Sequence, residues 1–500
     1  MSEAVDLVVI GGGINGAGIA RDAAGRGLSV IMCEKDDLAQ GTSSRSGKLV
    51  HGGLRYLEYY EFRLVREALI EREVLLNAAP HIIWPMRFVL PHSPQDRPAW
   101  LVRLGLFLYD HLGGREKLSG TRSLDLRHAP EGAPLKPQYV KGFEYSDCWV
   151  DDARLVVLNA LDASLRGAEI LTRTRCSSAR REGGLWRVEL TDTRNGSKRI
   201  VKARVLINAS GPWVNDIITI TGTNSRRNVR LVKGSHIITR KFWDGPQAYL
   251  VQNRDKRVIF INPYVGDKAL IGTTDIPYED APENVAATAD EVDYLIAAVN
   301  RYFTTQLGRA DVLETFSGVR PLFDDGQGNP SAVTRDYVFD RDDAGGAPLL
   351  NVFGGKITTF RKLAEHALQK LTDVFPHMTG SWTAGVPLPG GDIHQGDVNW
   401  LVKQLQREHA WMPRDLAQHY TRLYGTLTHN VIKGASSLSG LGRQFAPTLY
   451  EAEVMYLIAT EWAETADDIL TRRTKHGLHM SAKQKADFSA WFESRLAKSA

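Results

Sequence analysis

The sequence predicts a mixed α/β (α+β) fold with a Rossmann-type βαβ domain, an antiparallel-sheet domain and a helical domain at the C-terminal end. A short apolar run that stops at three glycines and continues into an Ala- and Gly-rich stretch predicts the first domain. Short alternating runs in the middle of the chain predict the sheets. Beyond residue 390, Trp, Arg, Leu and Ala dominate with helical spacing, which predicts the third domain.

Apolar periodicity and the positions of Gly and Pro divide the chain into elements. A strand over 5–10, a helix over 13–26 and a strand over 28–33 form the βαβ unit, and a long polar loop over 36–56 follows. Further helices are expected over 60–79, 151–166, 290–307 and 358–371. Further strands are expected over 81–91, 229–239, 247–251, 257–263, 268–272 and 349–353, with several short ones between 169 and 208. Residues 113–142 look irregular, and 385–391 form a linker.

Composition excludes several classes of protein. In 500 residues, 62 Lys and Arg against 58 Asp and Glu leave a net charge of +4, a thin excess of base for a nucleic-acid binder. No apolar stretch reaches the about 18–20 residues of a spanning helix, which excludes a multispan membrane protein. Three cysteines and the lack of a signal peptide indicate a reducing compartment, expected to be the cytoplasm, with contact to a membrane surface left open.

The first glycine turn has the features of a dinucleotide-binding fingerprint. Gly11 to Gly16 match G-x-G-x-x-G between a strand and a helix, and Glu34 closes the second strand. Gly11 permits the tight turn, Gly13 allows close approach of a pyrophosphate, and Gly16 lets the helix pack on the sheet. The helix N-terminus attracts phosphate, and Glu34 can accept hydrogen bonds from ribose hydroxyls.

Three features distant from the fingerprint favour a flavin dinucleotide over a nicotinamide one. A hydroxyl-rich loop covers 41–48, and two more glycine turns lie at strand ends, over 208–213 and 354–359. Turns spread over this much of the chain indicate one long ligand that a discontinuous domain holds. The sequence therefore predicts FAD as the cofactor.

At these positions the chain resembles the FAD-dependent glycerol-3-phosphate dehydrogenases, in particular the aerobic, respiratory bacterial enzymes. The resemblance rests on segments spread over residues 10–370, above all GGLRYLE and FGGKITTFRKLAE. The chain departs mildly from the family at Ser210, where Thr is usual, and at Arg45 and Gly47, where small or hydroxylated residues are common.

The resemblance implies a domain division and a physiological setting. FAD-binding segments are expected over 1–90, 151–228 and 341–385, a substrate or membrane-proximal segment over 91–150, a substrate domain over 229–340 and a helical cap over 390–500. The substrate would be sn-glycerol 3-phosphate, the product dihydroxyacetone phosphate and the electron acceptor ubiquinone. The enzyme would act in glycerol metabolism and the respiratory chain, as a peripheral homodimer on the cytoplasmic face of the inner membrane.

The expected site residues serve three tasks. Hydride would pass from C2 to flavin N5 while His236, or as second choice His51, takes the hydroxyl proton, with Arg320 and Lys356 completing the catalytic set. Arg side chains suit a phosphomonoester that carries about −1.5 to −2 charge, and the substrate-binding candidates are Arg55, Tyr56, His236, Arg320, Arg335 and Lys356. The cofactor-binding candidates are Gly11, Gly13, Ile14, Asn15, Gly16, Glu34, Lys35, Thr42, Ser43, Ser44, Lys48, Leu49, His51, Gly52, Ala209, Gly211, Trp213, Gly354, Gly355, Lys356 and Thr358.

Residues 100–109 are a candidate membrane contact because they combine large apolar groups, aromatics and a base. Arg63, Arg66 and Arg72 on the preceding helix are candidates for contact with anionic lipid. An interpretation of 100–109 as protein core is equally open. No HExxH, CxxC or EF-hand spacing is present, so no metal is expected.

Three alternatives to a quinone-linked dehydrogenase stay open. The first is an oxidase of the same fold that uses molecular oxygen. The second is an amine or amino-acid oxidase of the same superfamily. The third is a non-catalytic nucleotide-binding regulator, which the cationic residues beside the flavin motifs disfavour.

Overall fold

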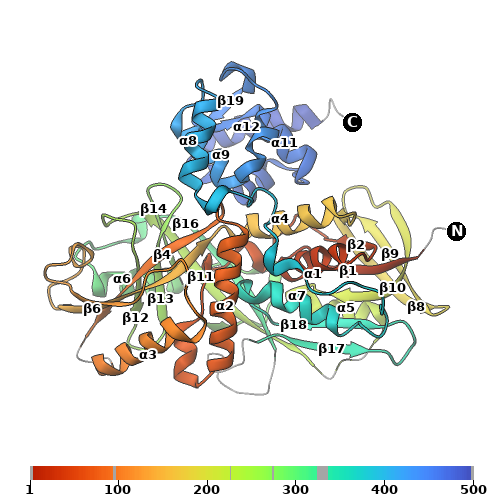
Figure 1. The fold of residues 1–500 in the computed structure, drawn as a ribbon, viewed down its shortest axis with the longest axis horizontal. Coiled ribbons are helices and arrows are strands. Elements are labelled where there is room, and N and C mark those ends of the chain that lie inside the picture. The colour runs from red at the N-terminus through yellow and green to blue at the C-terminus, as the bar shows by residue number, and fades with distance from the viewer. Residues whose placement is uncertain are drawn as a thin grey trace.

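The computed structural model describes residues 4–93, 97–223, 225, 227–272, 275–323 and 336–496. Two sheets lie side by side in the lower part of Figure 1, and a cap of helices lies above them. The predicted mixed α/β class, with a Rossmann-type domain and a helical C-terminal domain, is confirmed. No helix among these residues is long and apolar enough to cross a membrane.

The first sheet contains the predicted βαβ unit at its centre. Its parallel strands run in the order β18 (Leu349–Phe353), β10 (Lys198–Asn208), β1 (Val5–Ile10), β2 (Val30–Cys33) and β7 (Glu169–Leu171). β17 (Val338–Asp342) pairs antiparallel with β18, and β8 (Thr174–Glu182) and β9 (Leu185–Asp192) form a hairpin on β10. The strands β1, β2 and β18 are short and mostly buried because helices cover the sheet.

Three helices pack together against this sheet. They are α1 (Ile14–Gly25), α4 (Asp152–Leu165) and α7 (Phe360–Gln369), and their small and aliphatic side chains form one core with β1 and β10. α5 (Val214–Thr221) packs near the β8–β9 hairpin, in a second core. α1 contacts two helices from distant parts of the chain, α4 and α7. The parallel pairing of β10 with β1 and β18 then places the three glycine turns at one edge of the sheet.

The second sheet is antiparallel apart from the parallel pairing of β4 with β12. Its path is β15 (Ile276–Pro277), β11 (Val229–Arg240), β14 (Lys268–Gly272), β13 (Val258–Tyr264), β12 (Ala248–Gln252), β4 (Ile83–His92), β6 (Lys141–Val150) and β3 (Leu49–Val50). β16 (Val312–Phe323) pairs with β11, and β5 (Arg122–Asp125) pairs with β6. α6 (Ala289–Tyr302) packs on this sheet, and α2 (Phe62–Ala78) and α3 (Ala99–Leu112) flank its β4 and β6 end.

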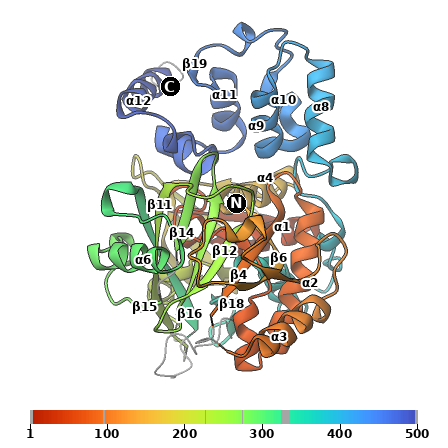
Figure 2. The ribbon, with the colours of Figure 1, turned by 90° about the vertical axis from the view of Figure 1, so that its left-hand side faces the viewer.

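The helical cap has its own core and lies on one side of the sheets in both views (Figures 1 and 2). Its helices are α8 (Val398–Glu408), α9 (Arg414–Tyr424), α10 (Thr428–Ile432), α11 (Glu451–Thr460) and α12 (Ala482–Leu496). A small hairpin, β19 (Gln444–Ala446) with β20 (Leu449–Tyr450), and a π-helical turn over Asp468–Arg473 interrupt the predicted helical pattern.

The π-helical turn holds the cap to the first sheet through buried ion pairs. Arg472 and Arg473 both bind the carboxylate of Asp37, which follows β2, and Arg473 binds it with two hydrogen bonds of 2.8 Å. Lys475 Nζ lies 2.6 Å from Asp151 at the start of α4. Because removal of one partner of a buried pair is costly, these contacts specify how the cap is placed.

Several local expectations differ from the structure. The segment expected to be a loop, 36–56, contains the 3-10 turns Thr42–Ser44 and Leu54–Tyr59 and the strand β3. The helix expected over 290–307 stops at Tyr302. β3 and β4 both join the second sheet although they belong to the expected FAD-binding segment 1–90, because β6 pairs with both. The domain boundaries themselves remain predictions.

Candidate active site

A cavity of about 920 Å³ lies between the two sheets. The three glycine turns, the loop over 41–47 and strands β11, β13 and β16 all contribute to its walls. This volume is near the upper end of the roughly 300–1,000 Å³ found for ligand pockets. The cavity is therefore large enough for an extended ligand rather than a single small metabolite.

The first glycine turn forms one wall in the way the fingerprint predicts. Gly11 has a φ of +113°, and a Cβ on it would lie 2.6 Å from the carbonyl oxygen of Ala209. A Cβ on Gly16 would lie 1.9 Å from the Gly11 oxygen, so helix α1 approaches the turn only without a side chain there. Gly13 is the N-cap of α1 and makes no side-chain cap. This arrangement leaves the helix N-terminus facing the cavity as a cradle for phosphate.

Glu34 lies at the end of β2 and also lines the cavity. Its carboxylate accepts hydrogen bonds from the backbone N–H groups of Gly12, at 2.7 Å, and Asp36, at 3.0 Å. Burial raises its pKa, while these two hydrogen bonds act in the opposite direction. The contacts orient the carboxylate at the position where the fingerprint expects a ribose.

The loop over 41–48 is attached to three different elements. Ser43 Oγ accepts a 3.0 Å hydrogen bond from the N–H of Ile14, and Thr42 donates to the carbonyl oxygen of Val319 at 2.6 Å. Lys48, an expected cofactor ligand, has another role: its ammonium lies 2.8 Å from Asp152 Oδ1 and 2.9 Å from the Ser44 oxygen. Lys48 therefore stabilises the loop from behind.

Most of the expected cofactor residues line the cavity. Those that do not are Gly16, Ser44, Lys48 and Gly52. Gly52 donates its N–H to the Tyr109 hydroxyl at 2.7 Å, so it belongs to the packing behind the site. Lys35 and Trp213 lie at the rim, where the ammonium is 4.1 Å from the indole centroid and both side chains bind Glu283.

The late glycine turn meets the first one and the loop before α2. Asn15 Nδ2 donates to the carbonyl oxygen of Gly354 at 3.2 Å, and Asn15 Oδ1 is buried without a partner among the described residues. Thr358 Oγ1 bridges the backbone N–H and carbonyl of His51, at 3.2 and 3.3 Å. Lys356 Nζ lies 3.9 Å from the centroid of the Tyr56 ring. Expected cofactor and substrate residues thus converge here.

His236 lies on β11, lines the cavity and is closely packed. Its ring stacks on Phe316 at 4.7 Å, and a Cβ on Gly272 would come within 1.9 Å of its Cδ2. Burial, with a contribution from the charges of Arg320 and Lys48, lowers its pKa to about 3. Its Nδ1 has no hydrogen-bond partner among the described residues. The imidazole is therefore neutral at physiological pH.

The three arginines expected to bind the substrate phosphate differ in their surroundings. Arg320 lines the cavity from β16 and forms an ion pair with Asp275. Arg55 also lines it, and its Nη2 lies 3.5 Å from the Tyr59 hydroxyl. Arg335 lies outside the described residues.

Sequence reasoning missed two residues that line the cavity, Asp275 and Asn262. The Nδ2 of Asn262 donates to the Gly47 oxygen at 3.4 Å. The signal for Asn262 was the alternation of side-chain direction along β13, which places Asn262 on the same face as Val258 and Phe260, toward the cavity.

The donor set fits FAD. The first glycine turn and the N-terminus of α1 form a cradle, a carboxylate lies at the end of β2, and a buried amide oxygen of Asn15 has no hydrogen-bond partner within the described part of the chain. Together with hydroxyls of the loop over 41–48, these groups match the phosphate, ribose and ring parts of a dinucleotide.

Comparison with known proteins agrees with this geometry. Residues 6–361 match the family described as FAD dependent oxidoreductase, and residues 381–487 match the C-terminal domain of alpha-glycerophosphate oxidase. D-erythritol 1-phosphate dehydrogenase of Brucella abortus (strain 2308) is 69% identical, over 98% of this chain and 98% of that one. Aerobic glycerol-3-phosphate dehydrogenase of Escherichia coli (strain K12) is 52% identical, over 98% and 97%.

A solved structure agrees over nearly the whole chain. The glycerol-3-phosphate dehydrogenase from Bacillus halodurans, complexed with FAD, superposes with a TM-score of 0.76 at 26% identity, covering 99% of this chain and 95% of that one. The resemblance inferred from the sequence and the FAD cofactor are thereby confirmed. The chain is an enzyme that belongs to the FAD-dependent oxidoreductase family in which the glycerol-3-phosphate dehydrogenases are found.

Proposed function

We propose that this flavoprotein oxidises the secondary alcohol next to the phosphorylated carbon of a short polyol phosphate, with D-erythritol 1-phosphate as the preferred substrate. The observation that carries the proposal is the buried imidazole of His236 on the strand beside that of Arg320, with both residues in the wall of the cavity that fits FAD. The four-carbon substrate is preferred because identity to the Brucella enzyme is 69%, against 52% to the Escherichia coli one.

The second candidate is sn-glycerol 3-phosphate, the substrate expected from the sequence, which is supported by several relatives at 51–52% identity. Both molecules contain a phosphomonoester and, on the neighbouring carbon, a secondary alcohol. The same residues therefore serve either substrate up to the carbon that is oxidised.

Oxidation of this alcohol removes a hydroxyl proton and a hydride. Bound FAD supplies the hydride acceptor. His236 takes the proton, because its neutral ring has a lone pair for it at physiological pH. A nearby substrate dianion raises the low pKa of His236, since negative charge favours the imidazolium form, and this makes the residue a stronger base when substrate is bound. His51, whose backbone is held by Thr358, is the second candidate for the base.

Cations bind the phosphate and lower the energy of the developing alkoxide. Arg320 and Arg55 line the cavity, and an arginine side chain offers five N–H donors in a plane that matches a phosphate. Asp275 engages Nη1 of Arg320 and so orients its plane. Lys356 adds a third positive charge beside the α7 end of the cavity, which also favours negative charge on the reduced flavin.

The test is an anaerobic reduction of the purified holoenzyme. D-erythritol 1-phosphate is expected to bleach the flavin absorbance with a kcat/KM above that of sn-glycerol 3-phosphate. A higher value for the glycerol ester makes the second candidate the substrate. Bleaching by an amino acid but by neither phosphate ester overturns the proposal in favour of an amino-acid oxidase. If neither phosphate ester nor an amino acid bleaches the flavin, the remaining alternative is a non-catalytic nucleotide-binding regulator.

The electron acceptor proposed is a membrane quinone, reached from a peripheral position on anionic lipid. Trp100, Leu104 and Phe107 of α3 are 69%, 47% and 49% exposed, while Leu106 and Tyr109 on the opposite face are buried. Leu101, Leu104 and Leu108 of the same helix line the cavity, so an apolar surface adjoins the route to the flavin. Such a face suits a monotopic helix in the lipid interface.

One expectation about lipid contact is wrong. Arg72 is buried and binds Asp147 at 2.7 Å, so it has no access to a membrane. Arg66 is exposed, and Arg63 is exposed but pairs with Asp336. The positive charge expected beside α3 is therefore smaller than the sequence indicates.

Flotation with anionic liposomes tests the surface. Trp100→Ser combined with Phe107→Ser is expected to abolish flotation without loss of FAD, whereas Leu165→Ser, at a leucine 70% exposed on α4, retains it. Flotation of the double variant at the wild-type level contradicts the assignment. Quinone reduction that exceeds peroxide release supports a quinone over oxygen, and sedimentation tests the homodimer.

A further inference from the structure

Gly47 lies in the loop before β3, lines the cavity and needs no glycine for its backbone conformation. Its φ is outside the left-handed region. A Cβ built on it would have one neighbour within 4 Å among the described residues, His236 Nε2 at 3.8 Å, which is an ordinary van der Waals distance. Its carbonyl accepts the hydrogen bond from Asn262, so the backbone is held in place. The missing side chain leaves open space beside His236.

Other glycines of the site show the contrast. A Cβ on Gly53 would lie 2.3 Å from the Tyr56 ring, and one on Gly272 would lie 1.9 Å from His236. Those two positions exclude any side chain because of packing. Gly47 accepts a side chain without a clash with the described part of the protein. A side chain there would therefore crowd only a ligand that lies next to His236.

We propose that Gly47 determines substrate length, by leaving room for the carbon that lies beyond the oxidised centre. This inference rests on the proposed function. With the phosphate at Arg320 and the alcohol at His236, a four-carbon substrate extends one CH(OH) group further than glycerol 3-phosphate. A side chain at position 47 occupies the space next to the base and opposes the longer substrate more than the shorter one.

The experiment compares kcat/KM for D-erythritol 1-phosphate and sn-glycerol 3-phosphate in wild type, Gly47→Ala and Gly47→Ser. Because crowding by one small group in a specificity pocket changes discrimination about 10–200-fold, the ratio is expected to fall at least about tenfold towards the glycerol ester. Gly380→Ala, outside the cavity and with open space around its Cβ, is expected to leave the ratio unchanged. Flavin absorbance verifies that each variant is folded.

The outcomes separate the two proposals. A wild type that oxidises both esters, with an unchanged ratio in both Gly47 variants, overturns the role of Gly47 alone. A wild type that oxidises only glycerol 3-phosphate overturns the preferred substrate and with it the role of Gly47. A fall in the ratio for Gly47→Ala but not Gly380→Ala supports both.

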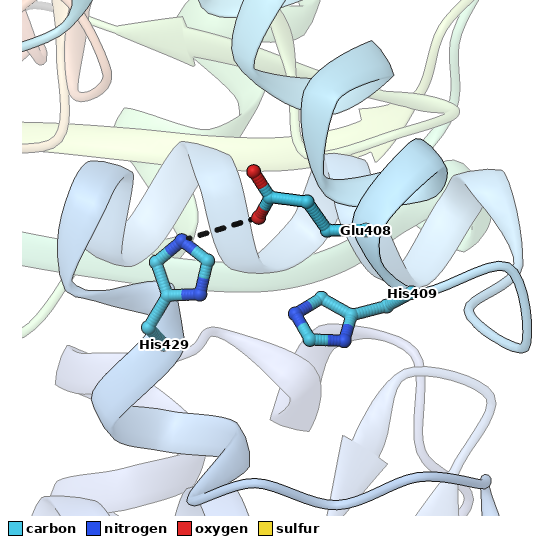
Figure 3. A group of neighbouring side chains, drawn as sticks. All are labelled: Glu408, His409 and His429. Atoms are coloured by element: carbon cyan, nitrogen blue, oxygen red, sulfur yellow. Dashed lines mark ion pairs between the residues drawn. The ribbon is translucent and has the colours of Figure 1, made fainter.

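A second site lies in the cap, far from this chemistry. Glu408 at the end of α8, His409 just after it and His429 in α10 point toward one another, as Figure 3 shows. Their ligand atoms lie within 4.8 Å of one another, and Glu408 Oε2 is 3.7 Å from His429 Nε2. Glu408 Oε1 accepts a 2.7 Å hydrogen bond from Gln404, which turns Oε2 toward the histidines.

We infer that these three residues bind a divalent transition metal, with zinc as the best match. Two imidazoles and one carboxylate are zinc ligands, and zinc–ligand distances of about 2.1 Å place tetrahedral ligands about 3.4 Å apart. The 3.7 Å separation is close to this value, and exposed side chains close the remaining gap by rotation. The carbonyl groups at the end of α8 add a favourable negative potential. The metal would join α8 to α10, with a position left for water.

Calorimetric titration of the metal-free holoenzyme with zinc chloride tests the site. One equivalent is expected to bind, with affinity reduced at least tenfold in both His409→Ala and His429→Ala and unchanged in His377→Ala, at an exposed histidine elsewhere. Cys33, Cys148 and Cys176 are buried, so thiols do not compete. Wild-type affinity in both cluster variants, or binding of less than one equivalent by wild type, overturns the assignment.

Discussion

His81, which lies between α2 and β4 and near Arg422 of the cap, is expected to make the enzyme lose stability at mildly acidic pH. Its side chain is fully buried, and neither ring nitrogen has a hydrogen-bond partner among the described residues. A Cβ on Gly390, in the linker to the cap, would lie 3.4 Å from its Nε2. Burial, and then the charges of Arg154 and Arg422, lower its pKa to about 3.

The magnitude follows from proton linkage. Between pH 6.5 and about 3 the unfolded chain binds a proton at His81 that the folded protein excludes, so stability is complete above pH 6.5 and falls with pH below it. Each pH unit by which the pH falls within this window lowers the free energy of unfolding by up to about 1.4 kcal/mol. Between pH 7.5 and 5.5 the loss from this residue is therefore about 1.4 kcal/mol.

Urea unfolding with saturating FAD, at pH 7.5 and at pH 5.5, measures this loss in wild type and in His81→Leu. His236 and His476 also have lowered pKa values and contribute equally to both proteins, so the difference between them isolates His81. The variant is expected to lose about 1.4 kcal/mol less over this interval, while His377→Leu behaves as wild type. Equal losses in wild type and His81→Leu would refute the reasoning.

Three further predictions concern the cap and the site. Arg473→Met leaves the buried Asp37 with one of its two arginines and is expected to cost about 3–5 kcal/mol in unfolding free energy, with weaker FAD binding measured by equilibrium dialysis; a loss below 1 kcal/mol contradicts it. His236→Gln is expected to lower kcat/KM about 10²–10⁴-fold with flavin absorbance unchanged, and near wild-type activity assigns the base elsewhere. Lys356→Ala is expected to lower both the flavin potential, measured by dye equilibration, and turnover; an unchanged potential excludes the electrostatic role.

Local chain patterns were sufficient to predict the elements that carry the expected nucleotide-binding residues. The turn at Gly11, the helix after Gly13 and the carboxylate of Glu34 at the end of β2 were all predicted correctly in type and position. Hydrophobic periodicity and glycine conformation depend on near neighbours, so a single sequence contains this information. Five strands of the second sheet, β4, β11, β12, β13 and β14, followed from the same signals within two residues at each end. The other five, β3, β5, β6, β15 and β16, were not predicted.

Partners and exposure required the tertiary structure. Lys48 lies in the loop that was expected to bind the cofactor, but its ammonium binds Asp152. Arg72 lies on a helix in a sequence typical of an exposed charge, but it is buried and binds Asp147. Asn262 belongs to none of the segments that carry the family resemblance, and Asp275 ends one of them, IGTTD, without a role that the segment itself indicates. Both residues line the cavity where β11, β13 and β16 come together.

The same division applies to larger parts of the molecule. The apolar run over 100–109 was equally consistent with core and with a surface, and the packing of α3 on α2 decided that Trp100 and Phe107 are exposed. The pairing of Asp37 with Arg472 and Arg473 joins positions more than 400 residues apart. Backbone conformation is set by adjacent residues, whereas the charge, burial and pKa of a side chain are set by groups that only the folded chain brings near.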